Sequence, residues 1–348
     1  MCPTSLPAAD PSTPADLLYL SRQDLIVLGG TYSQPYVDAA NAALLCHQRG
    51  DYVQPLKPYL RWPGATHIAD RIIAMPGYLG GPRPVAGLKW IGSRRHNPER
   101  FGLERASALI VLNDPDSNYP IAILEGGLIS GMRTAAITAI GARHLAGSGF
   151  QQVAVIGCGA IARMQLQTLL EQFPSISQVS LFDVAQEAAT ALAATLGQHF
   201  GEVRWNIARN AEQAVRGSEV VVTCTVTDTP YLPFDWLAAG SFVANVSIMD
   251  VHKEVYEQAD KVVVDDWEQS NRERKILHQL VLEGRFSRAQ LHAELGEIVA
   301  GQRPGRENAS EIILLNPMGM ALVDLACAQR FLERAQQAGV GRRLPLYG

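Results

Sequence analysis

The chain has 348 residues, of which 47% are hydrophobic and 18% charged, and its formal net charge is −4. This length predicts two domains, and the composition is ordinary for a soluble globular protein. Because lysine and arginine form no block, nucleic acid is not expected as a partner, and no apolar run is long enough to span a membrane. The first 16 residues lack the regions of a secretory signal and predict a short disordered lead. The scattered cysteines indicate reduced thiols in a cytoplasmic protein.

The first 125 residues predict an antiparallel β-sheet with flanking helices. Ser21 fits the N-cap of a helix that follows a short strand. Apolar residues at helical spacing predict a helix over residues 36–49. Strands are predicted over residues 71–78, 85–92, 107–113 and 119–124. The alanine-rich segment 127–145 predicts a long helix that leads into the second domain.

A dinucleotide-binding fingerprint follows the apolar strand predicted over residues 153–156. Its G-x-G-x-x-A residues are Gly157, Cys158, Gly159, Ala160, Ile161 and Ala162. Gly157 permits the turn, Gly159 leaves room for a pyrophosphate, and Ala162 lets the next helix approach the sheet. The N-terminus of that helix offers free N–H groups to the phosphates. The alternative is a glycine turn that binds no nucleotide.

The strand predicted over residues 179–182 ends at Asp183. A carboxylate at this position accepts hydrogen bonds from the adenosine ribose hydroxyls and repels a 2′-phosphate. The sequence therefore predicts NAD as the cofactor in preference to NADP. The eight histidines form no pattern typical of metal ligands, so no metal is predicted.

The segments after the fingerprint alternate between helix and strand, which predicts a doubly wound parallel sheet and an α/β protein. Helices are expected over residues 185–200 and 211–215, and strands over 203–206, 219–225, 241–246 and 261–266. Further along, a helix is predicted over residues 286–300, a strand over 311–315 and a helix over 320–337. The turn-rich segment 301–306 fits a domain boundary, and the last helix is expected to return to the first domain.

A nicotinamide enzyme needs positive charge to hold a substrate acid and a group that manages a proton. Lys57, Arg71, Lys89 and Arg133 are the candidates for the charge, since each lies in the first domain or at the joint. Lys89 and Arg133 stand out because apolar sequence surrounds them, and a buried charge needs a partner. Each is otherwise a surface charge or part of a structural ion pair. Asp250, after a predicted strand, is the candidate for the proton; its alternative role is a helix N-cap.

These residues belong to motifs that resemble the ornithine cyclodeaminase/μ-crystallin family over nearly the whole chain. The motifs lie at residues 87–91, 133–136, 157–162 and 245–250. The resemblance implies a β-rich domain at residues 1–132 that binds substrate and forms a homodimer, completed by residues 310–348. A Rossmann domain would span residues 133–309.

The resemblance also implies roles for individual residues. Lys89 and Arg133 would bind the carboxylate of an amino-acid substrate, with Asp250 as the acid and base and Lys89 also in the catalytic set. Thr134, Thr225 and Val226 would lie near the cofactor. The chain departs from the cyclodeaminases at Lys57, where they have an arginine, and at residues 248–249, where they have two glycines.

Segments 54–57, 70–76, 293–301 and 316–320 resemble one branch of the family, which supplies 2,3-diaminopropionate to siderophore pathways. This similarity implies NAD-dependent oxidative hydrolysis of N-(2-amino-2-carboxyethyl)-L-glutamate to 2-oxoglutarate and 2,3-diaminopropionate. The alternatives within the family are an ornithine cyclodeaminase, an alanine dehydrogenase and a ketimine reductase. An alternative of another class is a protein that binds a small molecule with NAD(P) and has no catalytic activity.

Overall fold

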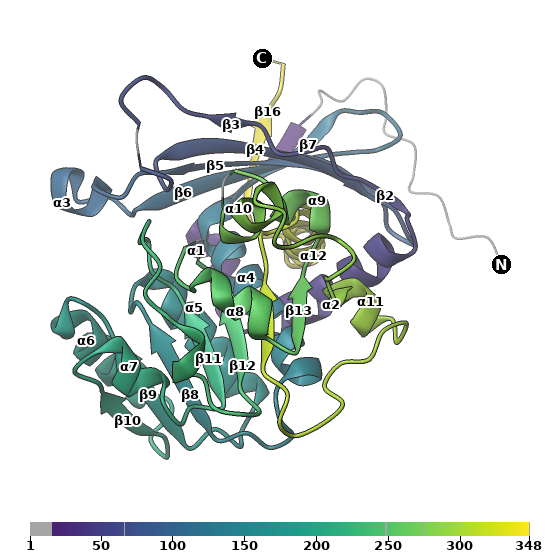
Figure 1. Ribbon diagram of the computed structural model, residues 1–348. Helices are drawn as coiled ribbons and strands as arrows, with labels where there is room; N and C mark the ends of the chain where they lie inside the picture. Colours follow the sequence, from purple (N-terminus) through teal and green to yellow (C-terminus); the bar gives the residue numbers. More distant parts are fainter. Residues whose placement is uncertain (1–15, 66, 248, 274, 348) are drawn as a thin grey trace.

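The computed structural model describes residues 16–65, 67–247, 249–273 and 275–347. The short lead predicted at the N-terminus lies, up to residue 15, outside the described residues. Two β-sheets dominate the molecule, and helices lie between them and around the second (Figure 1). No helix in the described ranges is both long and apolar enough to cross a membrane.

The first sheet contains mostly antiparallel strands, as the sequence predicts. Its order is β16-β1-β7-β6-β5-β4-β2, with β3 also paired to β4. The strands are β1 (Asp16–Leu20), β2 (Tyr52–Val53), β3 (Tyr59–Leu60), β4 (Arg71–Leu79), β5 (Val85–Ser93), β6 (Ala106–Asn113), β7 (Pro120–Glu125) and β16 (Arg342–Pro345). The sequence did not predict β16, because its two arginines hide the strand pattern. It pairs with β1 and forms one edge of the sheet.

The second sheet is wholly parallel in its described pairs, in the order β10-β9-β8-β11-β12-β15-β13-β14. Its strands are β8 (Gln152–Ile156), β9 (Gln178–Phe182), β10 (Arg204–Ile207), β11 (Val220–Thr223), β12 (Phe242–Asn245), β13 (Lys261–Val264), β14 (Ala293–Glu294) and β15 (Ile313–Asn316). The central strands are buried on both faces, which explains their continuous apolar runs. The doubly wound α/β class is therefore confirmed.

Helices join the two sheets into one body. They are α1 (Arg22–Val27), α2 (Gln34–Gln48), α3 (Asn97–Phe101), α4 (Gly126–Leu145), α5 (Ala160–Gln172), α6 (Gln186–Gly197), α7 (Ala211–Val215), α8 (Lys253–Gln258), α9 (Trp267–Ser270), α10 (Ile276–Leu282), α11 (Leu295–Val299) and α12 (Ala321–Ala338). Helix α4 contacts both β6 of the first sheet and β12 of the second, and α12 contacts β4, β5 and α4. One apolar core therefore runs from the first sheet into the second.

The structure corrects two expectations near the C-terminus. Residues 286–300 do not form one helix, since Ala293 and Glu294 pair with β13 as β14 and only then does α11 begin. The predicted domain boundary between residues 309 and 310 falls before β15, which lies between β12 and β13 in the second sheet. The chain returns to the first domain only after Asn316.

Candidate functional site

The fingerprint loop lies at the carboxyl end of β8 and forms a cradle at the start of α5. Gly157 has φ of +87°, and a Cβ added to it would lie 2.8 Å from the carbonyl carbon of Cys224. This glycine is therefore required both for the turn and for the close approach to β11. A Cβ added to Gly159 would meet no atom within 4 Å. The open space at this helix N-terminus fits a pyrophosphate.

The remaining fingerprint residues support the cradle. Gly159 is the N-cap of α5 and contributes no side-chain cap, so Ala160 and Ile161 begin the helix with free N–H groups. Ala162 is fully buried in the core beneath. Asp183 is tied to the loop, because its Oδ2 accepts a hydrogen bond from the Cys158 N–H at 2.7 Å and its Oδ1 one from the Ala185 N–H at 2.9 Å. Each carboxylate oxygen keeps a lone pair for a ribose hydroxyl.

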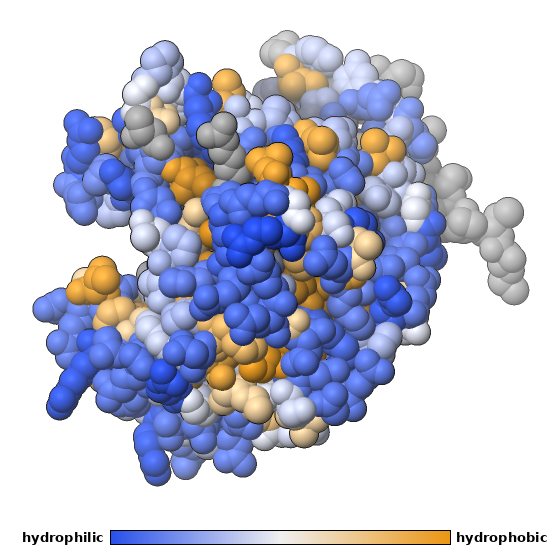
Figure 2. Space-filling view, in the orientation of Figure 1, coloured by the Kyte–Doolittle hydropathy of each residue, from blue (hydrophilic) through white to orange (hydrophobic). Residues whose placement is uncertain are grey.

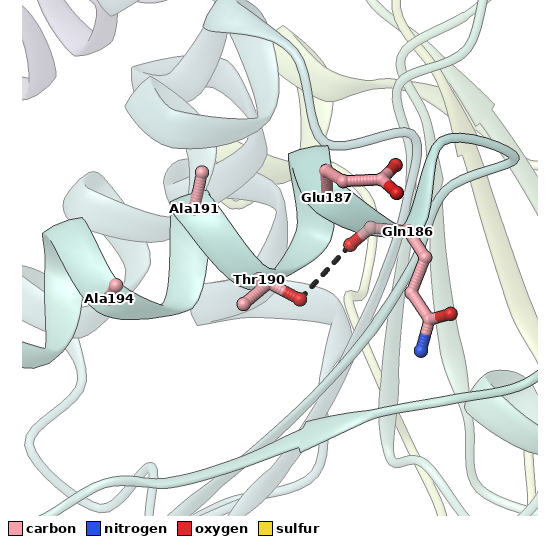
Figure 3. A pocket seen from close by; sticks show the side chains of 5 residues that line it. All are labelled: Gln186, Glu187, Thr190, Ala191 and Ala194. Atoms are coloured by element: carbon pink, nitrogen blue, oxygen red, sulfur yellow. Dashed lines mark hydrogen bonds between the residues drawn. The ribbon is translucent and has the colours of Figure 1, made fainter.

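A shallow hollow also lies on the outer side of α6, close in sequence to Asp183. Figure 3 shows that one helix supplies all of its lining, with Thr190 donating a hydrogen bond to the Gln186 carbonyl. The lining residues are Gln186, Glu187, Thr190, Ala191 and Ala194. Because no second element faces them, this hollow encloses nothing, and we assign no ligand to it.

Asp250 follows β12 at the carboxyl edge of the second sheet and is completely buried. Its Oδ1 accepts hydrogen bonds from the Thr225 hydroxyl at 2.7 Å and the Tyr231 hydroxyl at 2.8 Å. Its Oδ2 has no hydrogen-bond partner among the residues described. Burial raises the pKa of Asp250, against the hydroxyl hydrogen bonds that lower it. The N-cap of α8 is His252, so Asp250 is not a helix cap.

Buried polar side chains fix the strand ends at this edge. The Thr223 hydroxyl donates to Asn245 Oδ1 at 2.8 Å, and Asn245 Nδ2 donates to Asn316 Oδ1 at 2.8 Å. These residues end β11, β12 and β15, which are neighbours in the sheet. The loop of Thr225, the segment of Asp250 and the turn after Asn316 therefore leave the sheet side by side.

Lys89 and Arg133 share one buried partner, Asp324 of α12. Lys89 Nζ lies 2.7 Å from Asp324 Oδ2, and Arg133 Nε donates to Asp324 Oδ1 at 2.8 Å. Lys89 Nζ also donates to the Ser130 hydroxyl at 3.1 Å. Two cations on one carboxylate leave a net positive charge. Burial and the neighbouring Arg133 lower the pKa of Lys89 to about 7, although Asp324 raises it.

Lys57 joins this group through the turn after β15. Its Nζ donates to the carbonyls of Met318 at 3.0 Å and Gly319 at 2.8 Å, while the Asp265 carboxylate accepts from their N–H groups. Gly319 has φ of +82°, and an added Cβ would lie 3.0 Å from the terminal nitrogens of Arg133. Burial lowers the pKa of Lys57 to about 8.

The other predicted site residues lie on β4, on α4 and in the loop after β11. Arg71 is half-buried at the start of β4, where it donates to the Ile68 carbonyl, and its Nε has no partner in the described part of the chain. The Thr134 hydroxyl donates to the Ser130 carbonyl of its own helix at 2.7 Å. Val226 is 43% exposed in the loop after β11. The Thr225 hydroxyl donates to Asp250, and a Cβ added to Gly157 would lie 2.9 Å from the Thr225 backbone nitrogen, so a place near the cofactor stays a prediction for this residue.

Sequence reasoning missed several residues of the site. Asp324 is the acid in the apolar first two turns of α12, and that contrast was a signal that could have found it. Tyr231, Asp265 and Lys275 gave no local signal, because their importance comes from partners in other elements. The part of the chain that the structure describes contains no group of three residues suited to a metal ion.

The arrangement places a net positive group and a buried carboxylate at the edge of a sheet that begins with a dinucleotide cradle. Figure 2 shows the surface indented on its left side between the parts that contain the two sheets. Fold and fingerprint together are those of a dinucleotide-binding α/β protein.

The chain belongs to the ornithine cyclodeaminase/mu-crystallin family, whose sequence pattern matches residues 26–339. It is 54% identical over 333 residues to N-((2S)-2-amino-2-carboxyethyl)-L-glutamate dehydrogenase of Staphylococcus aureus, with 95% of this chain and 99% of the relative covered. It is 30% identical to the alanine dehydrogenase of Archaeoglobus fulgidus, with 89% of this chain and 93% of the relative covered.

Solved structures of the same architecture cover nearly the whole chain. An archaeal alanine dehydrogenase dimer with bound NAD superposes with a TM-score of 0.86 at 28% identity, covering 95% of this chain and all of that one. The Thermococcus litoralis Δ(1)-pyrroline-2-carboxylate reductase, in complex with NADH and L-proline, gives a TM-score of 0.88 at 27% identity, covering 94% of this chain and all of that one.

Proposed function

We propose that this protein is an NAD-dependent dehydrogenase that converts N-(2-amino-2-carboxyethyl)-L-glutamate, NAD⁺ and water into 2-oxoglutarate, L-2,3-diaminopropionate, NADH and a proton. The observation that carries the proposal is the buried group of Lys89, Arg133 and Asp324, with its net positive charge, combined with the 54% identical relative of that activity. The branch of the family favours a role in siderophore biosynthesis. Free thiols at the described cysteines support a cytoplasmic location.

Each side chain has a defined task in this reaction. Lys89 and Arg133 hold the carboxylate beside the glutamate Cα and so orient that carbon. The Gly157–Gly159 cradle and Asp183 would hold NAD⁺, which would accept the hydride from Cα. Asp250 uses its unpartnered Oδ2 to take the proton from the secondary amine, which becomes an imine. The same carboxylate then positions the water that adds to the imine carbon before the C–N bond breaks.

The proposal is tested by absorbance at 340 nm with NAD⁺ and a panel of amino acids. The panel holds the carboxyethyl-glutamate substrate, ornithine, alanine and N-alkyl amino acids. We expect NADH to form with the first compound alone, with 2-oxoglutarate appearing in equal amount. Proline formation from ornithine without net NADH, or NADH formation from alanine, would instead assign a different reaction of the family.

We expect Asp183→Ser to weaken NAD⁺ binding and to raise the relative affinity for NADP⁺. The substitution removes a charge that repels a 2′-phosphate and an acceptor for the ribose hydroxyls. Binding of both cofactors is measured by titration calorimetry on the purified protein. Asp183→Asn is the matched control, since it removes the charge but keeps an acceptor for the Cys158 N–H. An unchanged ratio of the two affinities in both variants would remove Asp183 from the ribose site.

We further propose that the first sheet forms a homodimer through the face that points away from α12. Trp90 and Leu109 are cross-strand neighbours on β5 and β6, and they are 41% and 46% exposed. Leu88 and Val111 pair on the same face of these strands. In Figure 2, apolar residues reach the surface over this sheet. An antiparallel sheet with apolar residues on its outer face needs a covering partner.

Trp90→Asp is therefore expected to convert a dimer into a monomer. A charge placed in the centre of an apolar interface leaves the carboxylate buried without a partner. Light scattering after size-exclusion chromatography gives the mass directly. Leu282→Asp serves as the control, because Leu282 is 68% exposed on α10 of the other domain. A Trp90→Asp protein that stays dimeric would place the interface elsewhere.

A further inference from the structure

A second group of cations lies around the ring of Tyr59 in β3. The guanidinium carbon of Arg61 lies 5.2 Å from the ring centre, and those of Arg71 and Arg272 each lie 5.8 Å from it. Glu273 pairs with Arg61 at 2.7 Å. Arg272 also donates to the Lys57 carbonyl at 3.1 Å, so the segment before α10 is seated against the segment that leads into β3. Positive charge therefore outnumbers negative charge here.

Lys275 lies deeply buried in this neighbourhood, at 3% exposure. The charged groups that act most strongly on it are Lys57 and Arg71, followed by Asp265 and Glu273. Both acids are already engaged, Asp265 with backbone N–H groups and Glu273 with Arg61. Burial therefore places the Lys275 side chain among charged groups in which the cations act on it more strongly than the acids.

Arg71 belongs to the same neighbourhood and is only partly paired, since its Nη1 donates to the Ile68 carbonyl. Its Nε is buried and has no partner in the described ranges. Buried cations without a partner are costly, and they persist where an anion arrives from outside. Burial lowers the pKa of Lys275 well below its usual range, and the two neighbouring cations lower it further, whereas an anion bound beside it would oppose both effects.

The second group shares one sheet face with the first. In the register of β4 and β5, Arg71 lies opposite Ser93 and Met75 lies opposite Lys89. Residues at even spacing along a strand point to the same face, so Arg71 and Lys89 face the same side. Four residues separate Arg71 from Met75, which corresponds to about 13 Å along the strand. A separation of this size is one that a small molecule with two acids can span.

We propose that Arg71 and Lys275 bind a second carboxylate of the substrate, remote from the carbon that is oxidised. The inference rests on the proposed function and deepens it. The proposed substrate has two such remote carboxylates, one on the glutamate side chain and one on the diaminopropionate part. Arg71 comes from the first sheet and Lys275 from the second domain, so the remote acid connects the two domains. Alanine lacks this acid, and the second cation of ornithine is repelled.

The test measures binding of product pairs to the protein saturated with NADH, by titration calorimetry. 2-Oxoglutarate is compared with 2-oxopentanoate, in which a methyl group replaces the remote carboxylate. L-2,3-Diaminopropionate is compared with 1,2-diaminoethane, which lacks its carboxylate. Since a hydrogen bond to a charged group is worth about 1.5–3 kcal/mol, we expect the wild type to prefer the acid of at least one pair by roughly tenfold or more.

Lys275→Met and Arg71→Met are expected to abolish that preference while leaving the affinity for the acid-free compound unchanged. The pair in which the preference disappears identifies the carboxylate that binds there. Lys261→Met is the matched control, because Lys261 is 6% exposed and lies at the opposite end of β13, where Glu307 and Glu311 hold it. It is expected to lower stability and keep the preference.

A wild type without a preference in either pair, or variants that keep the wild-type preference in both, would overturn the inference. Equal weakening of both members of a pair counts as a kept preference. The measurement needs no turnover, so it is independent of the absorbance assay. If the protein does not oxidise the carboxyethyl-glutamate, the proposed function is wrong. The remote carboxylate site is decided separately, by the ratio of the affinities for the acid and the acid-free compound in each pair.

Discussion

Asp250→Asn is expected to lower kcat by roughly 10²- to 10⁴-fold, the range that a positioned acid or base contributes. Asparagine keeps the shape of the side chain and an oxygen that accepts from the Thr225 and Tyr231 hydroxyls. It removes the basic oxygen, Oδ2, which has no partner in the described part of the protein. Initial rates of NADH formation measure the loss, and titration with NAD⁺ is expected to show unchanged binding.

The pH profile adds a second readout for Asp250. Burial raises the pKa of this carboxyl above its usual value, and the reaction needs the ionised form. The wild-type rate should therefore fall as the pH drops through that raised pKa, and this acidic limb should be absent in Asp250→Asn. Asp235→Asn, at an exposed position of the same domain, is the control for loss of a carboxylate. A variant with wild-type kcat and the same acidic limb would exclude Asp250 as the base.

Local signals explain why the cofactor half of the site is readable from sequence. The strand, the glycine turn and the helix at residues 153–172 are contiguous in the sequence. Contacts with nearby atoms therefore determine which residue types fit at these positions. Gly157 is required by the backbone of Cys224, and a Cβ at Gly159 would enter space that no described protein atom occupies. Asp183 ends the next strand, so a short spacing also places it.

The substrate half depends on contacts that no short segment contains. Arg133 and Asp324 are 191 positions apart in the sequence, yet they share a hydrogen bond. Sequence identified the cations, because a charge within apolar sequence is conspicuous. It did not identify their common acid, since the return of α12 to the first sheet depends on the tertiary fold. The predicted domain boundary at residue 310 was misplaced for the same reason. Only the pairing of β15 with β12 and β13 shows that this strand belongs to the second sheet.

Whether Asp250 is a helix cap or a candidate catalytic residue depends on the residue at which α8 begins. Asp before a helix is a good N-cap, so sequence leaves both roles open. In the structure the chain continues through His252 before α8 begins, and the Asp250 carboxylate turns to Thr225 and Tyr231. A shift of two residues in the helix start therefore separates a structural role from a candidate catalytic one.

Asp324→Asn is expected to destabilise the protein by about 3–5 kcal/mol, the usual cost of removing one partner from a buried ion pair. Lys89 and Arg133 then lie buried without their carboxylate. Because Asp324 raises the pKa of Lys89, its removal lowers that pKa below about 7. At a pH between these two pKa values of Lys89, the folded wild type keeps the Lys89 proton and the folded variant has lost it. The stability difference between wild type and variant therefore shrinks as the pH rises through this range. Thermal unfolding should therefore show a larger difference at pH 6 than at pH 9.

The same change should alter the pH dependence of catalysis. Binding of the substrate carboxylate needs protonated Lys89, so wild-type kcat/KM is expected to fall as the pH rises through about 7. In Asp324→Asn that fall should move to lower pH, in addition to a lower maximum. Glu333→Gln on the same helix is the matched control, since its partner Arg83 is at the surface and such pairs contribute about 0–1 kcal/mol. A basic limb that stays at the wild-type pH would show that Asp324 supports the fold without tuning Lys89.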